Sequence, residues 1–158
     1  MIADKIARVH ERIASACAGA GRPVQSVTLL VVSKTFGPEA VREAFLAGAR
    51  RFGENYVQEG SDKIDALADL RDRLEWHLIG PVQSNKTRLV AERFDWVHTV
   101  DRLKTAERLS AQRPAGLPPR PYERHLSPGK DASARTTCRR ASTRSRRFPT
   151  CGRTSNGI

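Results

Sequence analysis

Short apolar runs alternate along the chain with longer segments in which apolar residues recur every three or four positions. Such runs are typical of buried strands, and such periodic segments of amphipathic helices. The runs predict strands at Val27–Ser33, Arg51–Glu54, Glu75–Ile79 and Trp96–Val100. The periodic segments predict helices at Ile2–Ala20, Gly37–Gly48, Asn55–Leu70, Gln83–Arg93 and Asp101–Gln112, the last capped by Asp101. Because the two alternate with short connections, we expect an α/β fold with a parallel sheet.

Lys34 directly follows the apolar run of the first predicted strand. An unbroken run is typical of a strand buried on both faces, and parallel α/β folds bind ligands at the carboxyl ends of their strands. Apolar surroundings would disfavour the ammonium form of Lys34 and favour the free amine, a nucleophile that forms Schiff bases with carbonyl compounds. A solvated lysine that merely ends a strand is the alternative interpretation of this stretch.

Polar groups are predicted at the same edge of the sheet after the next two strands. Asn55 follows the second strand, His77 lies within the third, and Gln83-Ser84-Asn85-Lys86 opens the helix that comes next. A helix start presents backbone N–H groups that can bind an anion. Because these groups share one edge with Lys34, they favour a binding site there.

Each of these residues also has a purely structural interpretation. Asn55 could cap a helix, His77 could be a hydrogen-bonded core histidine, and Lys86 could be a solvated charge. His98, next to the end of the fourth predicted strand, is expected to be structural.

The net charge of +11 is concentrated at the end of the sequence. There are 18 basic and 15 acidic residues before Arg120, but 10 basic and 2 acidic residues from Arg120 to Ile158. This last segment has few large apolar residues and lacks the interleaved aromatic and basic residues that stack on bases. We expect a disordered tail at residues 118–158, for which weak, non-specific nucleic-acid binding is an alternative function.

Cysteine usage and the N-terminal sequence bear on the location of the protein. Cys17, Cys138 and Cys151 form no CxxC pair and no metal-ligand spacing. The N-terminus has no apolar signal region, and no segment approaches the ~20 apolar residues of a membrane span. These features predict a reduced, cytoplasmic protein with no metal site and no membrane partner.

Three motifs carry a specific resemblance: V-V-S-K-T at residues 31–35, R-F-G-E-N-Y-V-Q-E at 51–59 and W-H-L-I-G-P-V-Q-S-N-K at 76–86. In this order and spacing they resemble the YggS/PROSC family of pyridoxal phosphate homeostasis proteins, which are similar to the N-terminal barrel domain of alanine racemase. The resemblance covers about residues 2–117. It implies a partial (β/α)8 TIM barrel, comprising about the first four βα units, as an N-terminal domain at residues 1–117.

The same resemblance implies a cofactor and its site. Pyridoxal 5′-phosphate (PLP) would be held as a Schiff base on Lys34, with Asn55 and His77 near it. Gln83, Asn85 and Lys86 would belong to the characteristic loop after the third strand. The family is regarded as a carrier and regulator of PLP without a clear turnover reaction, so that PLP-dependent apoenzymes are further candidate partners.

A racemase-like enzyme that uses Lys34 as a base is a second alternative. It requires another acid–base group on the opposite face of the cofactor, and neither Tyr56 nor Tyr122 is a convincing one.

The sequence departs from the family after Gly116, where no further strand–helix units are evident. In the family, such units supply the phosphate-binding loop and the group that faces the pyridine nitrogen, so we expect impaired cofactor binding and a monomer or weak dimer. Arg139–Pro149 can be back-translated into GC-rich codons whose neighbouring frame reads A-R-V-D-A-V-A-A-L-P, an amphipathic helical pattern. This suggests the hypothesis that the chain past about Pro119 is a frameshifted reading of a longer gene.

Overall fold

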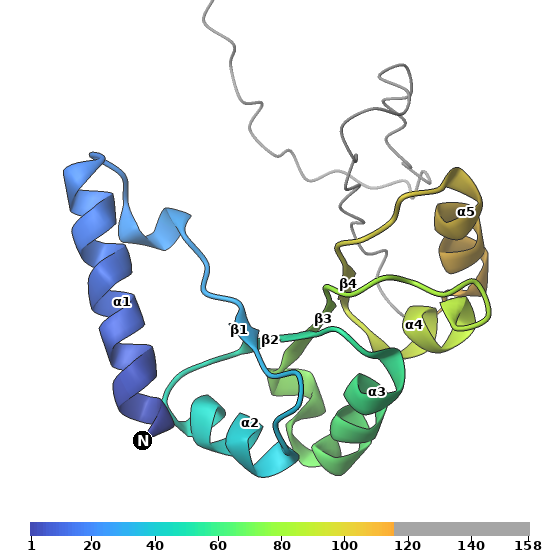
Figure 1. The fold of residues 1–158 in the computed structure, drawn as a ribbon, viewed down its shortest axis with the longest axis horizontal. Coiled ribbons are helices and arrows are strands. Elements are labelled where there is room, and N and C mark those ends of the chain that lie inside the picture. The colour runs from blue at the N-terminus through green and yellow to red at the C-terminus, as the bar shows by residue number, and fades with distance from the viewer. Residues whose placement is uncertain (116–158) are drawn as a thin grey trace, which may run out of the picture. The chain divides into compact units, whose positions relative to one another are not determined.

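The computed structural model describes residues 1–115, so the predicted boundary at residue 117 and the tail at 118–158 lie outside the described residues. The predicted order of strands and helices is confirmed (Figure 1). The elements are α1 (Ile2–Gly19), η1 (Val24–Ser26), β1 (Val31–Val32), α2 (Pro38–Leu46), β2 (Arg51–Glu54), α3 (Val57–Ala66), η2 (Ala68–Arg73), β3 (Glu75–Leu78), α4 (Thr87–Arg93), β4 (Trp96–Val97) and α5 (Leu103–Gln112).

The four strands form one parallel sheet in the order β1-β2-β3-β4. Phe52 pairs with Val31 on one side and Trp76 on the other, and His77 pairs with Gly53 and Trp96. Each strand is joined to the next through a helix, as parallel pairing requires. Sequential order and parallel direction are those of successive units of an eightfold barrel, and the predicted partial TIM barrel is confirmed.

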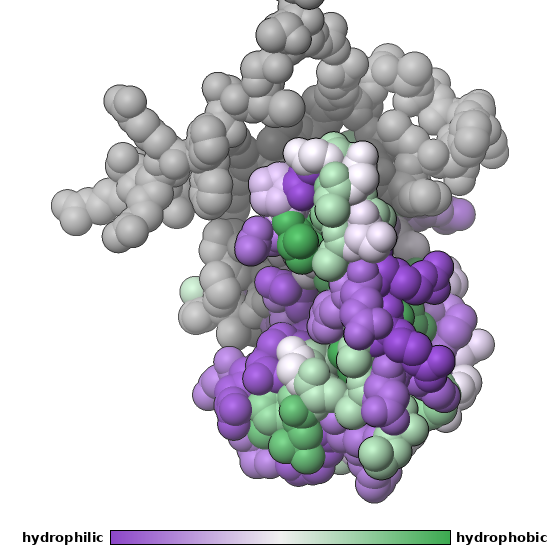
Figure 2. All heavy atoms as spheres, turned by 90° about the vertical axis from the view of Figure 1, so that its left-hand side faces the viewer, coloured by the Kyte–Doolittle hydropathy of each residue, from purple (hydrophilic) through white to green (hydrophobic). Residues whose placement is uncertain are grey.

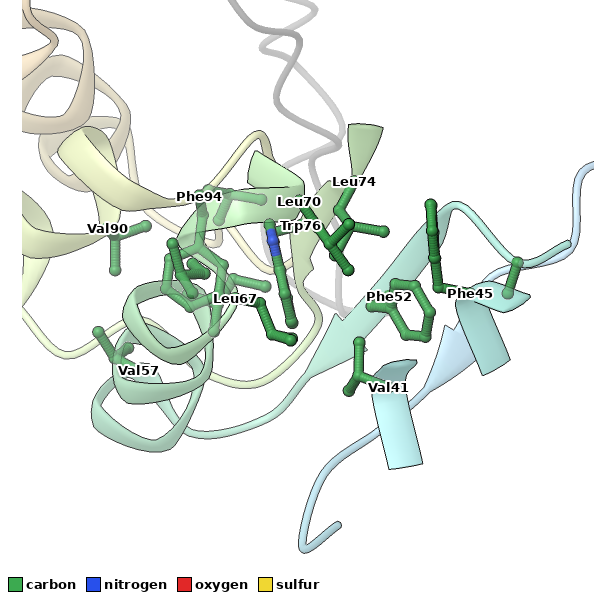
Figure 3. Packing of buried hydrophobic residues seen from close by; sticks show 14 of the residues in the cluster. Val41, Phe45, Phe52, Val57, Leu67, Leu70, Leu74, Trp76, Val90 and Phe94 are labelled. Atoms are coloured by element: carbon green, nitrogen blue, oxygen red, sulfur yellow. The ribbon is translucent and has the colours of Figure 1, made fainter. Parts of the chain in front are cut away.

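Alternate strand residues face the helices and build the core. Phe52 and Trp76 are fully buried, with their ring centroids 5.8 Å apart. Figure 3 shows Phe52 beside Val41 and Phe45 of α2, and Trp76 beside Leu67. Burying each of these large side chains contributes about 1.5–3 kcal/mol, so this layer holds the helices against the sheet.

The opposite sides of the helices are polar. In Figure 2, which views the molecule from the left of Figure 1, hydrophilic side chains predominate and hydrophobic ones form smaller separate patches. No helix within residues 1–115 is both long enough and apolar enough to cross a membrane.

The first strand differs from its prediction. It pairs only at Val31–Val32 instead of Val27–Ser33, and the Val32 side chain is 46% exposed. The exposure of Val32 shows that the face of β1 directed away from the helices is not packed. In addition, β1 has one neighbour among the described strands and so lies at an edge of the sheet. The prediction of a strand buried on both faces is therefore wrong.

Three helix boundaries also differ from their predictions. The N-cap of α3 is Tyr56, so Asn55 does not cap it, and α3 ends at Ala66 before a separate 3-10 turn. Arg102 is the N-cap of α5, so the predicted cap role of Asp101 is wrong. Neither N-cap residue uses its side chain to accept a hydrogen bond from the helix backbone, which is why capping propensity misplaced the two helix starts.

Replacing Phe52 by alanine should lower the free energy of unfolding by about 3–5 kcal/mol, because it leaves a cavity in the centre of the core. The matched change Leu46→Ala truncates a side chain that is 83% exposed. It should alter the free energy of unfolding by less than about 0.5 kcal/mol. Urea unfolding of both variants measures the difference. Equal effects would contradict the central place of Phe52.

Candidate functional site

Lys34 lies in a tight turn that follows β1. The turn begins where the Ser33 N–H donates to the carbonyl of Gly53 (3.0 Å), and it is closed by the Phe36 N–H donating to the Ser33 carbonyl (3.1 Å). Thr35 adopts φ +67°, a left-handed conformation that is uncommon for a β-branched residue. The Lys34 side chain is exposed, so the apolar surroundings expected from the sequence are not found.

A charged cluster, comprising Ser33, Glu54, Glu59 and Lys63, lies behind this turn on the helix side of the sheet. The Lys63 ammonium donates to the Ser33 carbonyl (2.6 Å), to Glu54 Oε1 (2.9 Å) and to Glu59 Oε1 (2.7 Å). Ser33 Oγ also donates to Glu54 Oε1 (2.6 Å), and the Thr35 N–H donates to Glu59 Oε1 (2.5 Å). We call this set the Lys63 cluster. It ties β1, β2 and α3 together directly behind Lys34.

The Lys63 cluster is strongly desolvated. Glu54 is 0% and Lys63 is 5% exposed, and Glu54 Oε2 has no hydrogen-bond partner within residues 1–115. The hydrogen bond from Lys63 lowers the pKa of Glu59 below its ordinary value, and the backbone N–H of Thr35 acts in the same direction, against the opposing effect of burial. Removing one partner of a buried pair leaves an uncompensated charge, which typically costs about 3–5 kcal/mol.

His77 lies on the other face of the sheet, the face directed away from the core. It stacks on Trp96 with ring centroids 5.6 Å apart and an interplanar angle of 5°. Its Nδ1 lies 2.9 Å from Nε2 of His98, and Trp96 Nε1 donates to Glu75 Oε1. The strand register places Gly53, His77 and Trp96 side by side on this face. Glu54 and Leu78, the next residues along β2 and β3, lie on the core face.

Burial lowers the pKa of His77 to about 4 from its ordinary value of 6.5, and His98 adds to the effect while Glu75 opposes it. His77 is 6% exposed, and its Nε2 has no hydrogen-bond partner within the described part of the chain. The nearest carboxylate oxygen, from Glu75, is 4.0 Å away. The imidazole is therefore neutral at pH 7 and keeps one polar atom available.

Asn55 and His98 follow the same face to the carboxyl edge of the sheet. Pairing continues beyond the strands through Ile79 N–H to Glu54 O (2.9 Å) and His98 N–H to Leu78 O (2.9 Å). Asn55 and His98 therefore lie two residues beyond Gly53 and Trp96, on the same face of their strands. His98 was expected to be only structural, yet its ring contacts that of His77.

The predicted loop at Gln83–Lys86 forms a turn rather than the start of a helix. The Lys86 N–H donates to the Gln83 carbonyl (2.9 Å), and α4 begins only at Thr87. Gln83, Ser84 and Asn85 line an open cavity of about 520 Å³. The other residues that line this cavity are Pro81, Val82, Asp101, Arg102 and Thr105.

A second cavity of about 520 Å³ lies on the helix side of the Lys34 turn, between Thr35–Pro38 and α3. Neither of these two cavities is lined by Lys34, Asn55 or His77. The structure thus joins His77 to His98 and places Lys34 and Asn55 at adjoining strand ends. It does not bring the Gln83–Lys86 turn and Lys34 into one cavity.

Sequence reasoning missed Glu59 and Lys63. Two signals could have found them. They lie four residues apart on one helix, the spacing of an ion pair, and Lys63 falls within the apolar stripe formed by Val57, Ile64 and Leu67. A lysine on the buried side of a helix needs an internal anion, and the nearest strand end offers Glu54.

The chain is 62% identical over 118 residues to the pyridoxal phosphate homeostasis protein of Pseudomonas aeruginosa, and 57% identical over 119 residues to that of Escherichia coli K12. This chain is a homologue of the pyridoxal phosphate homeostasis proteins. The alignments cover 75% of this chain in each case, and 50% and 51% of the relatives. The chain therefore spans about half the length of the curated relatives it matches, and no family model matches it.

Solved structures agree with this relationship. PipY of Synechococcus elongatus PCC7942, a COG0325 family member solved with PLP bound, has a TM-score of 0.55 and 48% identity. The matched region spans 66% of this chain and 47% of the PipY chain. A protein of unknown function from Bifidobacterium adolescentis has a TM-score of 0.66 and 36% identity over 70% of this chain and 49% of its own. The resemblance inferred from the three motifs is confirmed.

Replacing Gly80 by alanine should perturb the carboxyl ends of β2 and β3. A Cβ at position 80 would overlap the backbone carbonyl of Asn55, so the two strand ends must separate. We expect the free energy of unfolding to fall by about 1–3 kcal/mol. Gly53→Ala is the matched control, because its Cβ would meet only side-chain atoms, Ile79 Cδ1 at 3.2 Å and two atoms of Leu30 at 3.6 Å, and its effect should stay within about 1 kcal/mol. Thermal unfolding distinguishes them, and a well-tolerated Gly80→Ala would contradict the close approach.

The buried neutral His77 should make the protein less stable in mild acid. The unfolded state binds the proton near pH 6.5 and the folded state only near pH 4, so the contribution is complete above pH 6.5 and falls as the pH drops towards 4. Between pH 7 and pH 5 we expect a loss of roughly 2 kcal/mol. In His77→Gln this loss should largely disappear, whereas His10→Gln, at an exposed site on α1, should retain it. Urea unfolding at the two pH values measures it, and an unchanged loss in His77→Gln would refute the assignment.

Proposed function

We propose that this chain binds pyridoxal 5′-phosphate covalently through Lys34 and takes part in the homeostasis of that cofactor. The observation that carries the proposal is the exposed Lys34 amine, held at the carboxyl edge of a parallel sheet, in a homologue of pyridoxal phosphate homeostasis proteins. PipY, at 48% identity, was solved with PLP bound. The motif around Lys34 and the fold thus point to the same chemistry.

The surroundings of the Lys34 amine, within the described residues, are compatible with its reaction with an aldehyde. Within residues 1–115 Lys34 makes no ion pair, so its amine is not held by a carboxylate. Its amine would attack the aldehyde carbon, so that a C=N bond replaces the C=O bond and one water molecule leaves. When bound, PLP supplies an electron-withdrawing ring conjugated to that C=N bond.

Further residues are proposed to surround the cofactor on the basis of the family motifs. Asn55 and His77 would border it on the face directed away from the core, where His77 Nε2 offers an unpaired polar atom. Gln83, Asn85 and Lys86 would form a polar loop nearby. The cavity beside Gln83 and Asn85 also contains the guanidinium-bearing Arg102, the kind of cation that binds phosphate.

The finer aspects of the function follow the family resemblance. We propose PLP-dependent apoenzymes as partners and the cytoplasm as the location. The relatives reported above are named for cofactor homeostasis, and this supports neither a racemase nor a nucleic-acid-binding protein. The basic segment on which nucleic-acid binding would depend lies outside the described residues.

Incubating the purified 158-residue chain with PLP, reducing it with borohydride and mapping its peptides by mass spectrometry tests the proposal. We expect one pyridoxyl group per chain, on Lys34, because it is the lysine that the fold presents at the carboxyl edge of the sheet. Lys34→Ala should lose this adduct while keeping its thermal unfolding transition. Adducts spread over exposed lysines such as Lys5 and Lys104, without enrichment at Lys34, would overturn the proposal.

A further inference from the structure

The turn that carries Lys34 requires support from outside itself. Thr35 is a β-branched residue in the left-handed region, which is sterically disfavoured. Such a conformation persists only where its surroundings hold it, and it is often found at functional positions. Here the backbone N–H of Thr35 donates to Oε1 of Glu59, in the first turn of α3, at 2.5 Å.

Lys63 supports the same turn from the other side of Lys34. Its ammonium donates to the carbonyl of Ser33, the residue just before Lys34, at 2.6 Å. Ser33 is itself held by its hydroxyl on Glu54. The residues on both sides of Lys34 are thus fixed by the Lys63 cluster. The Lys34 side chain itself makes no hydrogen bond or ion pair within residues 1–115.

Lys63 is prevented from acting as a second nucleophile. An ammonium group has three N–H donors, and those of Lys63 have three acceptors between 2.6 and 2.9 Å. Two of these acceptors are carboxylates, and the Lys63 side chain is buried. The Lys63 amine is therefore enclosed by its partners and is not accessible to an aldehyde.

We propose that the Lys63 cluster selects Lys34 as the aldehyde-reactive lysine, with Glu59 and Lys63 as positioning residues. Glu59 and Lys63 hold the turn so that the Lys34 amine projects from the carboxyl edge of the sheet. Burial and three hydrogen bonds keep the Lys63 amine inaccessible to the same aldehyde. This inference rests on the proposed function, since it concerns the same condensation of the Lys34 amine with an aldehyde, in which a C=N bond forms and water leaves.

The test compares two acidic residues of the same helix in the full-length chain. Glu59→Ala removes the acceptor of the Thr35 N–H but leaves the Glu54–Lys63 pair intact. Asp62→Ala removes an equal charge three residues away, where the carboxylate accepts, among the described residues, only from Gln58. With PLP and borohydride, Glu59→Ala should form the Lys34 adduct roughly tenfold more slowly, the effect of one charge-assisted hydrogen bond. Asp62→Ala should stay within about twofold of the unmodified sequence.

Three further measurements separate positioning from stability. Adduct formation at exposed Lys5 and Lys104, followed in the same digests, should be unchanged in every variant. Glu59→Gln keeps an oxygen that accepts from Thr35 and should recover much of the lost rate. The double variant Glu54→Gln/Lys63→Met removes both buried charges together, which avoids an unpaired buried charge, and should also slow the Lys34 reaction.

Each outcome decides the inference. A selective slowing at Lys34 in Glu59→Ala, with recovery in Glu59→Gln, supports it. A lowered melting temperature with an unchanged rate at Lys34 in Glu59→Ala would overturn it and leave the proposed function standing. If the unmodified chain forms no selective adduct at Lys34, the proposed function fails and this inference fails with it.

Discussion

The buried ammonium of Lys63 is the constraint on which the Lys34 region depends. Moving an ammonium and a carboxylate out of water is expensive, and their attraction offsets this only when their remaining hydrogen bonds are made. Lys63 meets this condition with three acceptors, drawn from the end of β1, the end of β2 and its own helix. Because the three acceptors come from three different elements, the cluster links α3 to the ends of both strands. A single charged group thus defines the geometry of the strand end.

The parallel register then divides the sheet into two chemically different faces. Phe52, Trp76 and Leu78 turn towards the helices and form the core, while Gly53, His77 and Trp96 turn the other way. The second face is aromatic and polar, and its side chains are linked by stacking and hydrogen bonds, although His77 Nε2 has no partner within residues 1–115. A slip of one residue in β3 would exchange Trp76 for His77 in the core. The apolar layer therefore fixes which residues occupy the opposite face.

The sequence predicted the order of elements and the parallel sheet because apolar periodicity reflects burial directly. It could not predict that β1 pairs over only two residues. The apolar pattern of Val27–Val32 is the same whether or not other side chains cover its second face. It placed Lys34, Asn55 and His77 at one edge from connectivity alone. It missed the links from Lys63 to Glu54 and from His77 to His98, because they join residues that are distant or unremarkable in sequence. Such pairings follow from packing angles, which local pattern does not encode.

The support of Lys34 is local in the chain, and this bears on which parts of the protein it requires. All members of the Lys63 cluster lie between residues 33 and 63, within two consecutive βα units. The His77–His98 pair belongs to the following two units and touches none of the cluster. Orientation of the amine and construction of the neighbouring polar face are therefore separate tasks, assigned to different pairs of units. A barrel built from repeating units can divide its chemistry in this way because each strand end is fixed mainly by its own helix and its neighbours.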